Sequence, residues 1–151
     1  MNQFVLQQGS SGELRLFPHI LELGIVKNSS IRLNAFPKSS SKGIKIFSVL
    51  EGKYEWSIGN GQYTLYPDDL ALILPGQEFG SSNAVLEIGS FSWMHLNIQK
   101  NGNDEMMMGT WSSLSESENL AISKILLLNN SPVLSKFNDG RKILKSIQNE
   151  L

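Results

Sequence analysis

Apolar and polar positions alternate in short segments through the middle of the chain, from Ile44 to Pro75. Runs rich in Ile, Val, Phe, Tyr and Trp are interrupted every few residues by Glu51-Gly52, Asn60-Gly61 and Pro67-Asp68-Asp69. β-Branched and aromatic residues favour strands, whereas Gly, Pro, Asn and Asp favour turns. The pattern therefore predicts a tight antiparallel meander, which needs further strands to cover its apolar face.

Asn60-Gly61 is the strongest turn signal in this meander. A two-residue type I′ turn requires positive φ at both central positions, and Asn-Gly adopts them with little strain. The sequence therefore predicts a hairpin centred on this pair. The expected cross-strand neighbours are Trp56 and Ile58 on one strand and Tyr63 and Leu65 on the other.

Further strands are expected on both sides of the meander. Residues 17–26 and 31–36 are predicted strands, and residues 1–16, which are polar and contain two glycines, are predicted to form a loosely held arm. Along Phe91 to Ile98, alternation places Phe91, Trp93 and His95 on one face and Met94 and Leu96 on the other. Both faces are mostly apolar, so we expect this strand to be covered on both sides.

The pattern becomes helical after residue 104. Ser115 and Glu118 have the spacing of a capping box, which predicts a helix through about Asn129. Ser131-Pro132 is typical of a second helix start, with proline at the first helical position. A final amphipathic helix is predicted from Gly140, with its apolar side chains at Ile143, Leu144, Ile147 and Leu151. The predicted organisation is an arm over residues 1–16, a β-barrel over 17–100, and a linker with helices over 101–151.

Composition narrows the function. The 151 residues fit one domain. The chain has 13 basic and 14 acidic residues with no basic block, so we do not expect it to bind DNA by itself. It has no cysteine, which excludes disulfides, thiolate metal sites and cysteine nucleophiles. Without a signal peptide or a long apolar run, a soluble cytoplasmic protein is expected.

The order of elements resembles the N-terminal effector-binding domain of AraC-type transcriptional regulators. The residues that carry the resemblance are Leu50-Glu51-Gly52, Pro67-Asp68-Asp69, Leu74-Pro75-Gly76 and the aromatic strand FSWMHLNI, followed by a helical tail. The resemblance implies a mainly β fold, a cupin-like double-stranded β-helix (jelly-roll) barrel followed by a C-terminal helical segment used for dimerisation. It also implies a helix-turn-helix DNA-binding domain beyond Leu151, so that DNA would be contacted only through a domain not in this chain.

The sequence departs from the metal-dependent branch of the cupin fold. In that branch, a histidine pair precedes the hairpin and another histidine follows the Pro-Gly turn. Here Phe79 stands after Pro75-Gly76, and the chain contains only His19 and His95. A three-imidazole site cannot be assembled from two histidines, so neither a metal nor another cofactor is expected.

The resemblance also implies where a ligand would bind. In relatives it lies inside the barrel, and by position Trp93 and Phe91 match the aromatic strand while Lys38 lies near a basic contact in a loop. Independently, alternation gathers aromatic side chains on facing strands, a pocket suited to a sugar or an aromatic acid. The predicted ligand-contacting residues are Trp93, Phe91, His95, Trp56, Tyr54 and Lys38.

Three functional hypotheses follow. The leading one is a regulator domain that binds a small-molecule effector and forms a homodimer through Ile143, Leu144, Ile147 and Leu151. A second is a stand-alone cupin enzyme acting on a small sugar or keto acid. A third is an oligomerisation module whose barrel is filled by its own side chains, in which Trp56, Trp93 and His95 are core residues.

Overall fold

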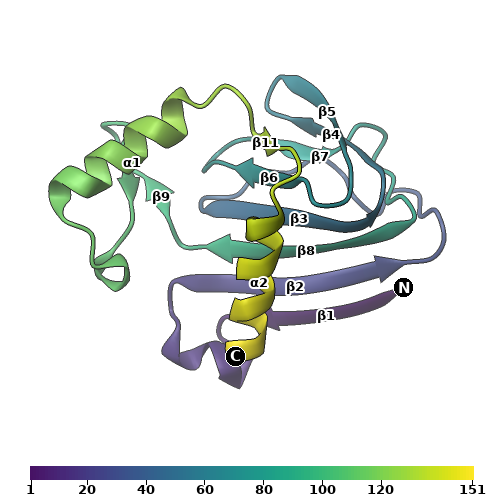
Figure 1. The fold of residues 1–151 in the computed structure, drawn as a ribbon, viewed down its shortest axis with the longest axis horizontal. Coiled ribbons are helices and arrows are strands. Elements are labelled where there is room, and N and C mark those ends of the chain that lie inside the picture. Colours follow the sequence, from purple (N-terminus) through teal and green to yellow (C-terminus); the bar gives the residue numbers. More distant parts are fainter.

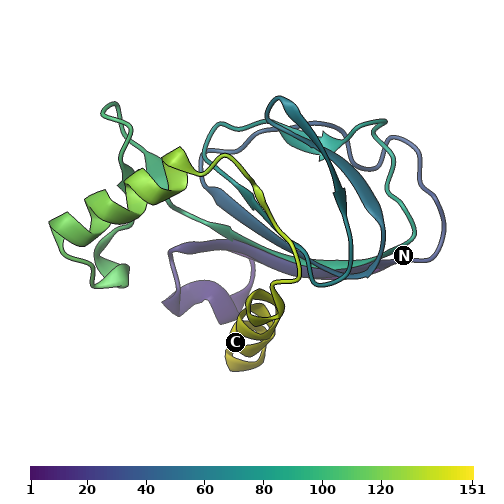
Figure 2. The same cartoon turned by 45° about the horizontal axis from the view of Figure 1, so that its top comes forward.

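The structure is a computed structural model that describes all 151 residues. It contains a large antiparallel sheet and a small one that face each other across an apolar core (Figures 1 and 2). The large sheet has the order β1-β2-β8-β3-β6-β11, and the small sheet has the order β5-β4-β7. The strands are β1 (Asn2–Gln7), β2 (Ile20–Asn28), β3 (Ile44–Gly52), β4 (Tyr54–Ile58), β5 (Gly61–Leu65), β6 (Leu70–Ile73), β7 (Phe79–Ser81), β8 (Gly89–Leu96) and β11 (Val133–Leu134).

This strand order confirms the predicted fold class. Sequence-distant β3 and β8 pair in the large sheet, and β4 and β7 pair in the small one, so the chain winds as a double-stranded jelly roll. The helical segment follows the barrel. Neither α1 (Glu116–Leu128) nor α2 (Asn138–Glu150) is long and apolar enough to cross a membrane.

The central meander is present, with its tightest turn one residue earlier than predicted. A turn at Asn60-Gly61 would pair Ile58 with Tyr63, but the structure pairs Trp56 with Tyr63 and Ile58 with Gly61, so the two-residue loop is Gly59-Asn60. Gly59 has φ 57°, whereas Asn60 stays outside the left-handed region. Positive φ at the first central position alone is the type II′ arrangement, which glycine favours there.

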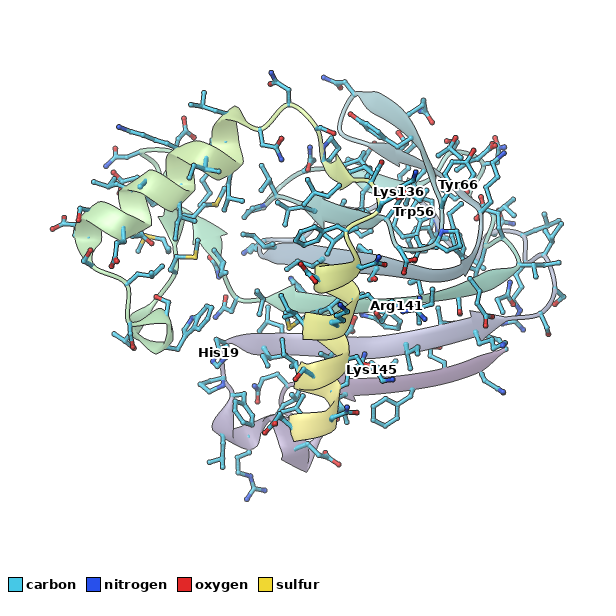
Figure 3. All side chains as sticks on the ribbon, viewed as in Figure 1. His19, Trp56, Tyr66, Lys136, Arg141 and Lys145 are labelled. Carbon is cyan, nitrogen blue, oxygen red and sulfur yellow. The ribbon has the colours of Figure 1, made fainter.

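The turn at Asp68-Asp69 fixes the start of α2. The carboxylate of the buried Asp69 accepts hydrogen bonds from the backbone N–H groups of Tyr66 (2.9 Å) and Lys136 (3.1 Å). Asp68 has φ 70° and forms an ion pair with Arg141 of α2 at 3.0 Å. Figure 3 shows Lys136 and Arg141 near this corner of the barrel. These turn carboxylates therefore serve the backbone and the helix.

Three predictions about local structure are wrong. The N-terminal residues form β1, which pairs with β2 along its length, instead of a loose arm. Residues 31–36 are irregular apart from one bridge between Arg32 and Leu86. Ser131-Pro132 does not start a helix, because the following residues form β11 on the edge of β6. Edge pairing across the sheet is a long-range contact, which local helix signals do not report.

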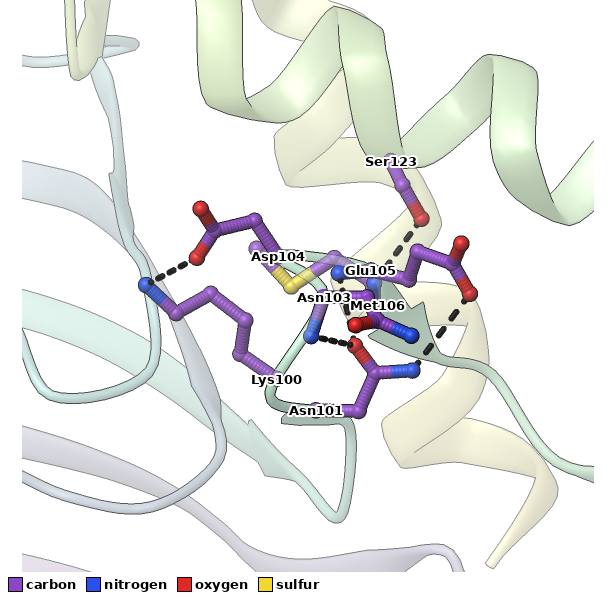
Figure 4. A network of polar contacts seen from close by, with 7 residues as sticks. All are labelled: Lys100, Asn101, Asn103, Asp104, Glu105, Met106 and Ser123. Atoms are coloured by element: carbon purple, nitrogen blue, oxygen red, sulfur yellow. Dashed lines mark hydrogen bonds and ion pairs between the residues drawn. The ribbon is translucent and has the colours of Figure 1, made fainter.

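The helix α1 begins at the predicted capping box. The Ser115 hydroxyl accepts from the Glu118 N–H at 3.2 Å, and the Glu118 carboxylate accepts from the Ser115 N–H at 2.7 Å. The helix packs on a small hairpin of β9 (Gln99–Lys100) and β10 (Met106–Met107). There the buried Ser123 hydroxyl accepts from the Met106 N–H at 2.8 Å (Figure 4).

The turn of this hairpin is ordered by Asn101. Its side-chain oxygen accepts from the N–H groups of Asn103 (2.9 Å) and Glu105 (3.0 Å), and Lys100 pairs with Asp104 at 3.1 Å (Figure 4). The hairpin and α1 therefore pack on one end of the barrel, where Met106 and Met108 share an apolar cluster with Ile44 of β3.

The helix α2 lies across the outer face of the large sheet, opposite the small sheet (Figures 1 and 2). Leu144 is 3% exposed and packs with apolar residues of β1, β2 and β8, and Ile147 and Leu151 pack against the same cluster. Only Ile143, 57% exposed, points away. Three of the four residues predicted for a homodimer therefore contact the chain's own sheet, because β8 presents an apolar outer face that needs a cover.

Candidate ligand-binding site

One cavity opens between the two sheets of the barrel, with a volume of about 310 Å³. Its wall includes residues from β1, β2, β3, β7 and β8 and from the loop at 35–39. Nine of its fourteen lining residues are hydrophobic, five of these are aromatic, and two of the others are charged, a composition that suits a small ligand. The residues that matter most are Glu22, Phe36, Lys45, Phe47, Phe79, Phe91 and Trp93.

Strand register explains why these residues meet. Glu22 of β2 and Lys45 of β3 both pair with His95 of β8, so the three lie in one row across the sheet. Two residues before His95 on β8, Trp93 lies between Gly24 and Phe47 in the next row. Since side chains alternate between faces, both rows point into the barrel.

Trp93 is held by a glycine and a carboxylate. Its indole Nε1 donates to Glu22 Oε1 at 2.6 Å. A Cβ built at Gly24 would lie 2.4 Å from Trp93 Cζ2, so the ring occupies space that only glycine leaves free. The second Glu22 oxygen accepts from Gln7 Nε2 at 3.3 Å. The indole is therefore oriented by the protein before any ligand is present.

Lys45 is a half-buried cation that makes no hydrogen bond or ion pair within the chain. Its Nζ lies 5.2 Å from the centroid of the Phe79 ring, close enough for a cation–π contact. Burial lowers the pKa of Lys45, and the nearby negative charge of Glu22 partly offsets this. Its ammonium is thus partly desolvated and free to pair with an anion.

His95 completes the charged row. Burial lowers its pKa, Lys45 lowers it further and Glu22 raises it, so the neutral imidazole is favoured. Its Nε2 is buried without a hydrogen-bond partner and lies over the backbone of Gly43, where a Cβ would be 2.8 Å away. His95 lies on the strand between those that carry Glu22 and Lys45.

The structure separates the sequence-predicted ligand residues into different environments. Trp93 and Phe91 line the cavity, and His95 lies in the row beside it. Tyr54 and Trp56 are fully buried in the aromatic core, where Trp56 contacts Phe91 and Phe47 with ring centroids 5.5 and 5.0 Å apart. Figure 3 shows Trp56 among the barrel strands. Tyr54 and Trp56 therefore pack against residues of the cavity wall without lining the cavity themselves. Lys38 is exposed in the loop, between the cavity residues Pro37 and Ser39.

Two charged residues of the wall were missed in the sequence. Glu22 lies in ILELGIV and Lys45 in IKIFSVL, each the only charge at an inward position of an apolar strand. A single charged residue among apolar inward-facing residues is the sequence signal that could have identified Glu22 and Lys45 as wall residues. The basic residue predicted from the resemblance was Lys38, in the loop, whereas the partly buried lysine beside the aromatic wall is Lys45.

No three His, Asp or Glu side chains of the chain gather closely enough to hold a metal ion. Phe79 contributes its ring to the cavity and to the contact with Lys45. The wall therefore offers apolar and aromatic surface, one cation and one carboxylate, with the His95 imidazole in the row beside it.

A second cavity, of about 330 Å³, lies outside the barrel, between α2 and the start of β2. There His19 stacks on Trp111 with ring centroids 4.3 Å apart (Figure 3 labels His19). Ile147 and Leu151 of α2 and Met94 of β8 form its apolar floor. This space results from incomplete coverage of the sheet by α2 and carries no charged row.

No family model matches the chain, and no protein of curated function matches its sequence significantly. Among solved structures, it is similar to a putative glyoxylate-induced protein from Pseudomonas aeruginosa, with 17% identity over 68% of this chain and 37% of that chain and a TM-score of 0.46. It is also similar to the Cnp3 cupin domain of Schizosaccharomyces pombe, with 14% identity over 53% and 57% of the two chains and a TM-score of 0.40.

A third similar structure is the cupin domain of an XRE family transcriptional regulator from Enterobacter cloacae, with 15% identity over 64% of this chain and 97% of that chain and a TM-score of 0.42. The chain spans less than two thirds of the first two proteins. Two of the three are named as cupin domains, the architecture that the strand order of this chain defines by itself. Similarity at this level carries no information about a ligand or a partner.

Proposed function

We propose that this chain is the ligand-sensing domain of an AraC-type transcriptional regulator and that it binds a small molecule inside the barrel. The observation that carries the proposal is the cavity wall of Trp93, Phe91 and Lys45, in which an oriented indole and an unpaired ammonium face the same space. Preformed aromatic cavities with few polar groups are the usual sites for small ligands. The regulatory role rests on the sequence resemblance in the barrel turns and the helical tail.

A ligand in this cavity would contact two elements that can transmit its presence. Gln3 of the edge strand β1 and Met1, directly before that strand, line the same space. Lys45 pairs with Ile73 of β6, and β6 carries β11, which leads into α2. A ligand shifts an equilibrium only through a difference in affinity for two states. The element that switches between two states is therefore β1 or the β11–α2 segment, through a change in how it packs on the barrel. This change would alter the arrangement of the two subunits of a homodimer and of their DNA-binding domains.

The test of ligand binding is a thermal-shift screen of small sugars, organic acids and neutral aromatics. Ala35→Trp is the variant that fills the mouth, because Ala35 lines the cavity from an exposed loop. Leu33→Trp is the matched control, since Leu33 is 76% exposed and lies outside the cavity. Hits that stabilise the wild type and Leu33→Trp but not Ala35→Trp support the proposal. A screen with no such hit contradicts it and favours a ligand-free oligomerisation module.

Sensing has a separate test. Hydrogen exchange with and without a hit reports which backbone segments are stabilised. The proposal expects slower exchange in β1 or in the β11–α2 segment as well as in the wall strands. If protection rises only at β3 and β8, the ligand binds without reaching the segments that would signal.

A barrel enzyme is the second candidate, favoured by the lowered pKa values of Lys45 and His95 beside a cavity. Such shifts are frequent at acid–base centres. An enzyme would consume its ligand. Proton NMR of each hit over a day with stoichiometric protein distinguishes the two, because a sensor returns the hit unchanged, whereas an enzyme produces a new species at a rate that Lys45→Met abolishes.

A further inference from the structure

We infer that the ligand is a small organic acid whose carboxylate pairs with Lys45 and whose apolar body lies against Phe79, Phe91 and Trp93. This inference rests on the proposed function, in that it assumes a ligand in the barrel, and it selects among the ligand classes that an aromatic cavity admits. Four features of the wall support it.

The first feature is the unpaired cation. Lys45 contributes a positive charge to the cavity and has no carboxylate within ion-pair distance and no hydrogen-bond acceptor. In contrast, the lysines and arginines that do form ion pairs lie at the surface, as Lys27 does with Glu51 at 3.1 Å. A partly desolvated ammonium is costly unless it finds an anion. The carboxylate of a ligand would supply one.

The second feature is that Glu22 is already occupied. One of its oxygens accepts from Trp93 Nε1 and the other from Gln7 Nε2. Each of its oxygens thus already holds one donor from the protein, which leaves only part of its accepting capacity for the hydroxyls of a sugar. A sugar bound here would leave most of its hydroxyl groups against aromatic rings, where unpaired polar groups are unfavourable.

The third feature is the spacing of the charges. Glu22 and Lys45 are two strands apart with the neutral His95 between them. Neighbouring strands lie about 4.8 Å apart, so the backbones of β2 and β3 are about 10 Å from each other. Although Glu22 and Lys45 both line the cavity, no ion pair joins them, so an anion can reach the ammonium on the β3 side of the wall.

The fourth feature is the apolar surface next to the cation. The Phe79 ring lies 5.2 Å from Lys45 Nζ, and the rings of Phe36, Phe47 and Phe91 continue the wall. A molecule with a carboxylate at one end and an aromatic or branched aliphatic body at the other matches this arrangement. The volume of about 310 Å³ limits it to a small one.

The experiment measures binding of matched pairs by isothermal titration calorimetry. The probes are benzoate with benzamide, phenylacetate with phenylacetamide, and D-arabinose as a neutral sugar. The proteins are the wild type, Lys45→Met, which keeps the apolar stem, Lys38→Met, which removes the loop lysine, and Lys42→Met, which removes an exposed lysine outside the cavity. Each variant is first checked for an unchanged melting temperature.

The inference expects the acid of a pair to bind about tenfold or more tightly than its amide, since a hydrogen bond to a charged group is worth that much. Lys45→Met should remove this preference and leave amide binding within about threefold, while Lys42→Met and Lys38→Met keep it. Equal binding of acid and amide by the wild type overturns the acid class. A preference lost in Lys38→Met but kept in Lys45→Met overturns the assignment to Lys45.

Failure of the inference is distinguishable from failure of the proposed function. If neutral compounds or D-arabinose bind and Ala35→Trp blocks them, the barrel is a ligand site of another class and only the inference fails. If no acid, amide or sugar binds at any accessible concentration, the inference is overturned. The wider thermal-shift screen then decides whether the barrel binds anything.

Discussion

The indole of Trp93 occupies the space that a side chain at position 24 would need. A Cβ at Gly24 would lie 2.4 Å from Cζ2 and 2.6 Å from Cη2 of the ring. The ring is in turn fixed by its hydrogen bond to Glu22, two residues before Gly24 on the same strand. One strand thus supplies both the gap that admits the indole and the acceptor that orients it.

Gly24→Ala should therefore displace Trp93 and destabilise the fold by about 1–3 kcal/mol, the usual cost of overpacking. Urea unfolding followed by circular dichroism measures the stability. Gly102→Ala is the control, because nothing lies within 4 Å of a Cβ there. Equal stability of the two variants would mean that the ring moves aside freely, contrary to a fixed ligand platform.

Glu22→Leu should cost about 1–3 kcal/mol, because it leaves the Trp93 indole N–H without its acceptor in a partly buried position. Glu22→Gln keeps an acceptor oxygen at the same place and should cost less. The same substitutions remove the negative charge that raises the pKa of Lys45, so that pKa should fall in both. NMR titration of the Lys45 side chain tests this second effect, and an unchanged pKa would show that the two charges do not interact.

Stability should fall as the pH drops below about 6.5. Burial lowers the pKa of His95 and of His19 from 6.5 in the folded chain, so the unfolded chain binds more protons in this range and acid favours it. The stability that depends on a neutral His95 is fully present above pH 6.5 and is lost as the pH falls through the lowered pKa of His95. The positive charge of Lys45 also lowers this pKa, and the negative charge of Glu22 raises it. Urea unfolding between pH 5 and 7.5 should show a shallower pH dependence for His95→Gln. The same slope in both proteins would contradict the buried neutral imidazole.

Asp69→Ala should destabilise the chain by about 1–3 kcal/mol, since it leaves the N–H groups of Tyr66 and Lys136 without their acceptor. Asp68→Asn is the matched comparison. It removes the charge that pairs with Arg141 and accepts from the Asn138 amide, both partly exposed interactions, and keeps a residue that tolerates positive φ, so its effect should stay below about 1 kcal/mol. The reverse order of the two effects would show that the corner is held by the ion pair.

Leu144→Ala should cost about 2–5 kcal/mol, as expected for truncation of a leucine in a core. Ile143→Ala, at an exposed position of the same helix, should change stability little. A homodimer through α2 would use Ile143, so Ile143→Glu, measured by analytical ultracentrifugation, is the variant that tests it. If Ile143→Glu leaves the mass of a dimer unchanged, α2 does not form the interface.

Much of the barrel could be predicted from sequence signals between residues that are close in the chain. The meander, the turn carboxylates at Asp68 and Asp69 and the capping box at Ser115 depend on residues near one another in the chain, and each was predicted close to its place. Where prediction failed, a distant partner decided the structure. β1 forms because β2 offers an edge, and Val133-Leu134 form β11 because β6 does.

The candidate site divides in the same way. That Phe91 and Trp93 share one face of β8 follows from alternation alone, because successive side chains point to opposite faces, whereas the tertiary structure decided that this face points into the barrel. Lys45 and Glu22 could not be placed beside it without the pairing of β3 and β2 with β8. The destination of Leu144 and Ile147 also required the tertiary structure, since an amphipathic helix has the same pattern whether it covers its own sheet or a second subunit.

The sequence by itself determined the antiparallel meander, the aromatic strand and the lack of histidines for a three-imidazole centre, because these depend on composition and on residues close in the chain, while the jelly-roll class was implied by the family resemblance. Only the tertiary structure decided that Glu22, His95 and Lys45 form one row and that Lys45 lies unpaired over Phe79. It also decided that α2 covers the sheet. These features depend on the register between strands tens of residues apart, which is set by packing of the whole barrel.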